Sequence, residues 1–405
     1  MKKVLLFACV VFAAISASAQ KLMPAEKSLV FIKQPVKVTN ILANPDIQVK
    51  KMTAITANMD KAPAKADIYG SYIEDALSTD GELHTCSEAT LSAANVQDED
   101  GNVYDIQLVI DNGVISIYGK YDPATGVVNC GAQLSDGGGD ATGYHFEVYG
   151  IVDGKLSEEL SFTIDDDKAI SCDQDGYIMY ISDEGEYNGY TWDGPHFDPM
   201  FYPVNGVQAG FTNGSSTGNQ WVEYENSISV EDWGASVTIY NFCGMGALSI
   251  DINDDGTVSV PCGQAVYDLG FNEETQAEEI ATYGKYLCFH GVDVDESTGN
   301  ISTNTNKENV VGIISGNTIT LTEYFRICSL FDSEGSGYAH NWYADGTTFT
   351  LNDGNYSNAA GVEEITETRE DKIKNTKTYN VMGQQVNRAT AKGLLIRDGK
   401  KFFKK

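Results

Sequence analysis

An internal repeat is the feature of this sequence that most constrains its fold. Residues Gly113–Gln133 and Gly246–Gln264 each read as a strand, a turn that starts at Asp and ends at Gly, and a second strand that closes on Cys-Gly and Gln. Cys130 and Cys262 take matching places in the two copies. The copies lie about 130 to 140 residues apart, which is too long for a solenoid repeat or a propeller blade and suits a whole β-domain.

The pattern around the repeat is typical of strands and tight turns. Short runs that alternate apolar and polar residues lie between Asp-Gly and Asn-Gly pairs, and residues 146–150 match residues 287–291. We therefore predict an all-β fold of two tandem antiparallel modules, residues 67–210 and 211–355, each a β-sandwich or a lipocalin-like barrel. Up-and-down connections are favoured because the hairpins are local. Residues 273–279 carry weak helical periodicity and are predicted to form a loop.

The N-terminus has the pattern of a cleavable signal peptide at residues 1–19. Lys2 and Lys3 precede an apolar core at residues 4–15 that is too short to span a bilayer, and Ala17-Ser18-Ala19 supplies small residues at a cleavage site. An extended leader is predicted at residues 20–66 and a polar linker at residues 356–377. No later stretch is long and apolar enough to predict a transmembrane helix.

The C-terminal segment, residues 378–405, is basic and reads as a small β-hairpin unit. It contains Tyr379-Asn380-Val381-Met382-Gly383-Gln384-Gln385-Val386, then Lys392-Gly393-Leu394-Leu395-Ile396, then Gly399-Lys400-Lys401. These residues resemble the C-terminal sorting domain (type A) carried by cargo of the type IX secretion system in the Bacteroidota. The resemblance implies export through the outer membrane, recognition by the type IX machinery, and a secreted or outer-membrane surface location. It covers only about the last 28 residues. The segment is shorter than many such domains, which leaves cleavage or anchoring open.

Charge is distributed very unevenly along the chain. Residues 67–368 hold 6 Lys and Arg against 52 Asp and Glu, a net charge of −46, whereas residues 369–405 hold 11 against 3, a net charge of +8. So acidic a body repels phosphate backbones and anionic lipid, which argues against nucleic acid as a partner. Solubility outside the cell is the simplest role of this charge.

One aromatic cluster is a candidate ligand site. Tyr187, Tyr190, Trp192 and His196 lie in the run 187–198. Flat rings with polar edges suit stacking on sugar rings, so the run predicts a glycan-binding loop. Packing of the same rings in the core of the first module is the alternative.

Metal sites are weakly indicated. Asp193, His196 and Asp198 could chelate a metal, and Asp98-Glu99-Asp100-Gly101-Asn102 resembles the start of a calcium loop but lacks the expected Glu at the twelfth position. Similar acidic runs at 165–167, 253–255 and 293–296 suit hairpin turns, with calcium as a possible cofactor. Seven cysteines remain after the signal peptide, and their spacing suggests buried thiols with one or two disulfides rather than a zinc site.

No catalytic motif is present in the sequence. It lacks G-x-S-x-G, H-E-x-x-H, a P-loop and G-x-G-x-x-G, and its five histidines stand apart. No catalytic residue is predicted, and an enzyme is the less favoured class. We predict a secreted or cell-surface, non-enzymatic binding protein for a glycan or a protein. A structural or adhesive surface component and an unrecognised hydrolase on a β scaffold are the alternatives.

Overall fold

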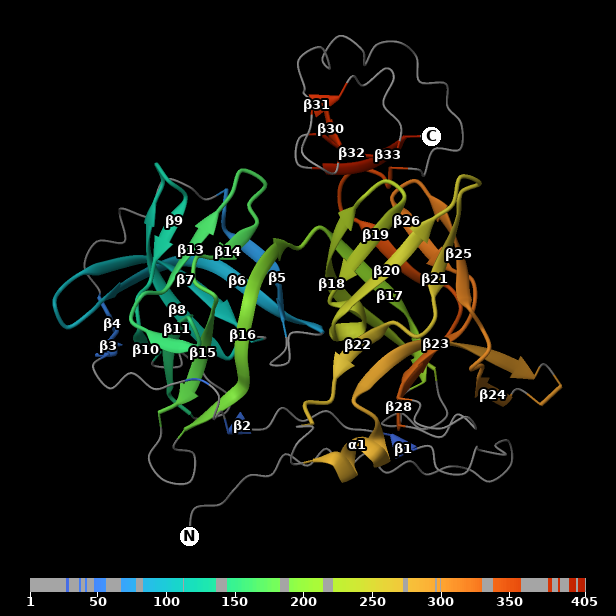
Figure 1. Cartoon of the computed structure of the whole chain (residues 1–405), viewed down its shortest axis with the longest axis horizontal. Helices are drawn as coiled ribbons and strands as arrows, with labels where there is room; N and C mark the ends of the chain where they lie inside the picture. The colour runs from blue at the N-terminus through green and yellow to red at the C-terminus, as the bar shows by residue number, and fades with distance from the viewer. Residues whose placement is uncertain are drawn as a thin grey trace.

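In the computed structural model, the described part of the chain is built of β-strands except for one short α-helix, α1 (Ala277–Tyr283), and a 3-10 turn (Figure 1). The structure describes residues 27–28, 36–37, 41, 47–55, 67–77, 83–111, 113–135, 144–182, 189–213, 221–271, 276–295, 297–298, 300–329, 338–357, 378–380, 385–386, 393–397 and 400–404. The loop predicted at 273–279 is wrong from Ala277 onward. Glu278 and Glu279 in the first turn favour the positive end of this helix.

Eight strands close into the first barrel, and each pairs antiparallel with the next around the ring. In ring order they are β5 (Gly70–Leu77), β6 (His84–Gln97), β7 (Val103–Ile110), β8 (Ile115–Asp122), β9 (Val127–Asn129), β13 (Ser161–Ile164), β14 (Ile170–Cys172) and β16 (Tyr190–Pro203). Ring order equals chain order, with two gaps. The predicted up-and-down hairpins therefore make up most of the barrel.

A second barrel follows with the same plan. Its ring consists of β17 (Gly206–Asn213), β18 (Val222–Asp232), β19 (Ser236–Tyr240), β20 (Ala247–Ile252), β21 (Thr257–Pro261), β25 (Asn309–Ser315), β26 (Thr318–Leu321) and β29 (Thr347–Leu351). The two tandem β modules are thus confirmed, and of the two predicted architectures each is a barrel. The change from one barrel to the other lies between Pro203 and Gly206, ahead of the predicted boundary at residue 210.

The strands missing from each ring form a side sheet that branches from it. In the first barrel β16 continues into a sheet with β15 (Gly176–Ile181), β11 (Phe146–Val152) and β10 (Gln133–Ser135). In the second, β17 pairs with β28 (Tyr338–Tyr343), and the sheet continues through β27 (Phe325–Cys328), β23 (Tyr286–Asp295) and β22 (Ala265–Asp268). A short hairpin strand, β12 (Lys155–Ser157) or β24 (Asn300–Thr303), extends each side sheet.

Strand register shows that the barrels match residue by residue. One row of directly opposed residues in the first barrel is Ile164, Ile170, Phe201, Glu74 and Ser87. The corresponding row in the second barrel is Ile314, Ile319, Phe349, Gln208 and Asn226. In the side sheets, Gly150 opposite Tyr177 corresponds to Gly291 opposite Phe325. The predicted match of 146–150 with 287–291 is therefore confirmed.

Two glutamines explain why the repeat ends as it does. The Gln133 side chain accepts a hydrogen bond from the Tyr118 N–H (2.8 Å) and donates to the Tyr118 carbonyl (2.9 Å). Gln264 makes the same pair of bonds with Ser249, at 2.9 Å each. Each amide thus occupies the place of a strand residue and satisfies backbone groups that the short neighbouring strand leaves open.

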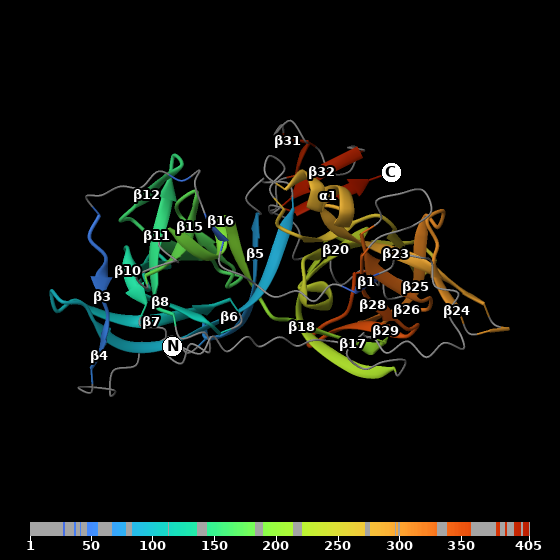
Figure 2. The same ribbon diagram turned by 90° about the horizontal axis from the view of Figure 1, so that it is seen from below.

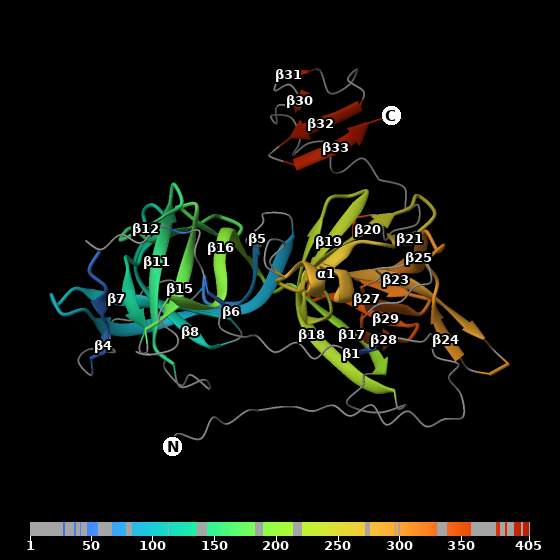
Figure 3. The same cartoon turned by 60° about the horizontal axis from the view of Figure 1, so that its bottom comes forward.

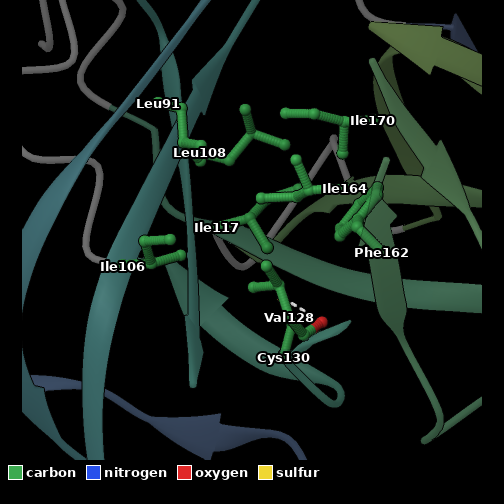
Figure 4. A pocket seen from close by; sticks show the side chains of 9 residues that line it. All are labelled: Leu91, Ile106, Leu108, Ile117, Val128, Cys130, Phe162, Ile164 and Ile170. Atoms are coloured by element: carbon green, nitrogen blue, oxygen red, sulfur yellow. Dashed lines mark hydrogen bonds between the residues drawn. The ribbon is translucent and has the colours of Figure 1, made fainter. Parts of the chain in front are cut away.

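The interior of the first barrel is filled by alternating side chains. Along β7, Tyr104, Ile106, Leu108 and Ile110 are buried while the residues between them are more exposed. Figure 4 shows the side chains that line a cavity in this core: nine in all, eight of them hydrocarbon and one a cysteine. The cavity measures about 10 Å³. That is the size of one water molecule with no polar wall to hold it, so this part of the barrel is dry core rather than a lipocalin-type ligand cavity.

The two barrels touch along one side of the first. Figures 2 and 3 show β5 and β6 on the side of the first barrel that faces the second. The Cys86 N–H donates to the Met245 carbonyl at 3.1 Å, and the rings of Tyr202 and Tyr240 stack with centroids 4.5 Å apart. Ser229 also donates to the Pro203 carbonyl at 2.9 Å, which ties the connecting segment to β18.

Four short strands from the described residues between 27 and 54 add to both barrels, and the extended leader stays a prediction. These strands are β1 (Lys27–Ser28) on β28, β2 (Val36–Lys37) on β16, β3 (Lys50–Lys51) on β10 and β4 (Thr53–Ala54) on β6. Ile41, Ile47 and Val49 pack with Ile151 and Ile178 on the outer face of the first side sheet.

The C-terminal strands form a small antiparallel sheet in the order β31 (Gln385–Val386), β30 (Thr378–Asn380), β32 (Gly393–Arg397) and β33 (Lys400–Lys404), which lies beside the second barrel in Figures 1 and 3. In the described residues, no helix has the length and hydrophobicity to cross a membrane.

Candidate functional site

The predicted ligand residues fall on the first part of β16, except Tyr187, which lies outside the described residues. Tyr190 is half-buried and packs against the core of the first barrel. Trp192 lies within β16, and its side chain is outside the described part of the structure. His196 is buried, with 8% of its surface exposed. The structure thus brings Tyr190, Trp192 and His196 onto one strand of the side sheet, and glycan contact by these residues stays a prediction.

A β-bulge interrupts β16 between these residues. Thr191 lies opposite Tyr180 and Pro195 lies opposite Ile178, so residues 192–194 face the single residue Met179. Gly194 has φ 96°, which glycine adopts without strain, and its N–H donates to the Thr191 hydroxyl at 2.9 Å. A bulge redirects side chains out of the regular alternation, and bulges are frequent beside functional sites. Trp192 therefore sits on a backbone feature that is fixed locally by its own strand.

A buried polar network lies directly after the bulge. The Glu74 carboxylate, 1% exposed, accepts hydrogen bonds from the His196 Nδ1 (2.8 Å), the Ser87 hydroxyl (3.0 Å) and the Tyr177 hydroxyl. The Tyr177 hydroxyl also lies 3.2 Å from the His196 Nδ1. Four strands, β5, β6, β15 and β16, thereby converge on one carboxylate at the point where the side sheet leaves the barrel. Three donors satisfy most of its acceptor sites, which is the condition for burying a charge.

Aromatic rings pack around this carboxylate and exclude water from it. The rings of Tyr177 and His196 stack at 4.7 Å, and Phe162 meets Tyr177 edge-on at 6.1 Å. Burial raises the pKa of the nearby Cys172 thiol to about 12, and the charge of Glu74 contributes to that shift. Such a thiol is inert as a nucleophile. The arrangement has the character of a core network rather than of a substrate cleft.

Sequence reasoning missed Glu74, Ser87 and Tyr177. The signal that could have found Glu74 is strand alternation: Tyr72 packs in the barrel core, so Glu74, two residues on, points inward as well. A charged residue on the inward face of a strand needs a partner. Sequence alone does not show which of the distant histidines supplies it.

The second barrel carries a neutral version of the same site. By register, Gln208 stands where Glu74 does, Asn226 where Ser87 does, and Phe325 and Tyr343 where Tyr177 and His196 do. The Phe325 and Tyr343 rings stack at 4.6 Å, as their counterparts do. The Gln208 side-chain oxygen accepts from the Asn226 amide (3.2 Å) and from the Cys243 N–H (2.7 Å). Only the first barrel places a carboxylate and an imidazole at these positions.

In the acidic turns proposed as calcium loops, the carboxylates accept hydrogen bonds from residues of the same turn. The Asp98 carboxylate accepts from the Asn102 N–H and side-chain amide, each at 2.8 Å, and lies 3.6 Å from the Lys50 ammonium. Asp165 accepts from the N–H groups of Asp167 and Ala169, and Asp295 accepts from Ser297 and Thr298. Bonds from an Asp side chain to groups two to four residues on are typical of tight turns, and that between Asp165 and the Asp167 N–H is an Asx turn. Within the described ranges, no three His, Cys, Asp or Glu side chains gather as they would around a metal ion.

All seven cysteines that follow the signal peptide are thiols in the structure, so the predicted disulfides are not formed there. Cys130 and Cys328 are buried and the other five are half-buried, in line with the expectation of buried thiols.

Comparison of the chain with protein-family models, with curated proteins and with solved structures gives no match.

Proposed function

We propose that this chain is an exported, non-enzymatic binding protein, secreted or held at the cell surface, that contacts a glycan at the bulged start of β16. The observation that carries the proposal is the bulge at 192–194, which redirects the backbone of an aromatic-rich segment beside a rigid core network. Tyrosine and tryptophan rings there would stack on sugar rings, whose faces are apolar and whose edges are polar.

The packing of the first barrel supports contact on its outside. The cavity of about 10 Å³ in its core admits no sugar, which favours contact at the rims, loops or outer faces. The net charge of −46 over residues 67–368 favours neutral or cationic ligands and disfavours phosphorylated or sulfated ones. A neutral glycan fits both conditions.

Export by a type IX-like route is part of the same proposal. It is supported by the signal-peptide pattern at residues 1–19 and by the resemblance of residues 378–405 to a type A sorting domain. In this proposal the basic tail is the segment that the secretion machinery reads, and the acidic barrels are the cargo.

Binding of the mature chain to a glycan array, in calcium and again in EDTA, tests the proposed function. Trp192→Ala should abolish binding to the glycans that the wild-type chain retains. Trp233→Ala is the matched control, because Trp233 is 43% exposed and lies at the β18–β19 turn of the second barrel. If the wild-type chain binds no glycan in either buffer, or if Trp192→Ala and Trp233→Ala lose binding equally, there is no glycan site at the bulge.

A further inference from the structure

We propose that the Glu74–His196 pair makes the β15–β16 hairpin of the first barrel sensitive to pH, and that ligand contact at the bulge is regulated by it. The second half of this inference rests on the proposed function, whereas the first half stands on the geometry of the core. The second barrel provides the comparison, because Gln208 and Tyr343 occupy the positions of Glu74 and His196 and carry no charge at physiological pH.

The proton has a defined place in this network. Because a carboxylate only accepts, the His196 Nδ1 carries the hydrogen that points to Glu74, 2.8 Å away. Uptake of a further proton therefore occurs at Nε2 and turns a hydrogen bond between a neutral imidazole and a carboxylate into an ion pair. A buried carboxylate gains from a cationic partner because opposite charges attract more strongly where water is excluded. Acidification toward pH 5.5 thus tightens β16 onto β5.

Other titratable groups around the pair come from every strand packed against it. Tyr177 from β15 donates to Glu74, and Cys172 from β14 and Asp198 from β16 lie within electrostatic reach of each other and, through Cys172, of Glu74. On the opposite face of β5, Asp75 accepts from the Cys86 thiol at 3.9 Å. Burial raises the pKa of both thiols, so neither ionises near neutral pH. His196 is the basic group that the structure pairs with Glu74.

The hairpin links this pair to the ligand segment. His196 follows Gly194 of the bulge by two residues, and Tyr177 lies directly opposite His196 across the β15–β16 ladder. A change in the strength of the Glu74–His196 contact therefore acts on the strand that holds Trp192. The equivalent hairpin of the second barrel, β27–β28, has no such pair, because Phe325 and Tyr343 stack there instead. Any response to pH there has the opposite sign, because the neighbouring His290 lies opposite Arg326 of β27 and has a lowered pKa.

Hydrogen exchange of the full mature chain at pH 5.5 and pH 8, corrected for intrinsic rates, tests the switch without any ligand. The opening constants of β15 and β16 amides should be about tenfold larger at pH 8, the effect of a difference of one pKa unit between the closed and open states, whereas those of β27–β28 should not be larger at pH 8. The E74Q/H196Y variant, which installs the residues of the second barrel, should lose this response. An unchanged response in the variant, or none in the wild type, would overturn the inference.

If the E74Q/H196Y variant fails to fold, a second measurement on the wild-type chain still tests the inference. Nitrogen NMR of the wild-type His196 ring should show proton uptake at Nε2 between pH 8 and pH 5.5, and an imidazole with a constant protonation state over this range would overturn the inference. For any glycan that the array retains, affinity at the two pH values then tests regulation of the site separately. If glycan affinity is the same at pH 5.5 and pH 8 while the opening of the β15–β16 hairpin depends on pH, then pH does not regulate binding. The pH sensitivity of the hairpin and the binding function would both still hold.

Discussion

At the scale of single residues, the two barrels differ in the residue at one equivalent position of the core. Glu74 and Gln208 occupy the same place in matching rows, and both side chains collect hydrogen bonds inside a β-barrel. The sequence placed His196 in a candidate ligand segment but did not identify Glu74 as its partner, because Glu74 lies 122 residues away. Alternation can show that Glu74 points inward, yet only the closed ring shows which strands meet there.

Removing the Glu74 side chain should be far more damaging than neutralising it. Glu74→Ala leaves Tyr177, Ser87 and His196 without their common acceptor and should lower the free energy of unfolding by about 3 to 5 kcal/mol. Glu74→Gln keeps an acceptor of the same length and should cost about 1 kcal/mol. Urea denaturation of the two variants checks this, and equal losses would show that the carboxylate is not the centre of the network.

The second barrel has a pH dependence of a different origin. Burial, with the charge of Arg326, lowers the pKa of His290 to about 4. An unfolded histidine takes up its proton near pH 6.5, so between about pH 6.5 and pH 4 the unfolded chain binds more protons and stability falls as pH falls. His290→Tyr installs the residue found at the matching position, Tyr149, and removes this contribution.

The expected size of the His290 effect is about 1 to 2 kcal/mol, reduced from the full shift because the ring is partly solvated. Denaturation at pH 7 and pH 4.5 gives the loss of unfolding free energy on acidification for the wild type and for His290→Tyr. The difference between the two losses is the His290 effect, because the contribution of the carboxylates is the same in both chains. A wild-type chain that loses no more stability on acidification than His290→Tyr would contradict it.

At the scale of elements, local pattern predicted most strands and long-range closure decided the rest. The repeat from Gly113 and from Gly246 gave the hairpins and the Cys-Gly-Gln endings correctly, because each is a contact between near neighbours. The branching side sheets were not predicted, since they depend on where β10, β11 and β15 leave the ring. Helix α1 was missed because its seven residues bury no side chain and so show no apolar stripe.

Glycine positions in the β15–β16 hairpin test how closely its strands approach. A Cβ on Gly176 would lie 2.0 Å from the His196 carbonyl oxygen, so Gly176→Ala should destabilise the chain by about 2 to 3 kcal/mol and shift His196 away from Glu74. Gly70→Ala at the start of β5 meets nothing within 4 Å and should change stability by less than about 0.5 kcal/mol. Thermal unfolding of both variants would expose an error if their losses were similar.

At the scale of the whole molecule, charge divides the chain into an acidic pair of barrels and a basic tail. The composition predicted this division, and strands β32 and β33 of the small C-terminal sheet, which is separate from the two rings, carry Arg397, Lys400, Lys401 and Lys404. Deleting residues 378–405 should leave the chain folded but retained inside the cell envelope, whereas deleting residues 361–376 should not stop export. Cell fractionation measures both, and normal release of the chain without its tail would contradict the sorting role.

The most direct test of the central claim is hydrogen exchange of the mature chain with and without a glycan that the array identifies. The binding account predicts protection in residues 189–197 of the first barrel and none in the equivalent residues 338–343 of the second, so that one molecule supplies both the site and its control. Protection confined to other surfaces, or equal protection of the two equivalent segments, would contradict a ligand site at the bulge of β16.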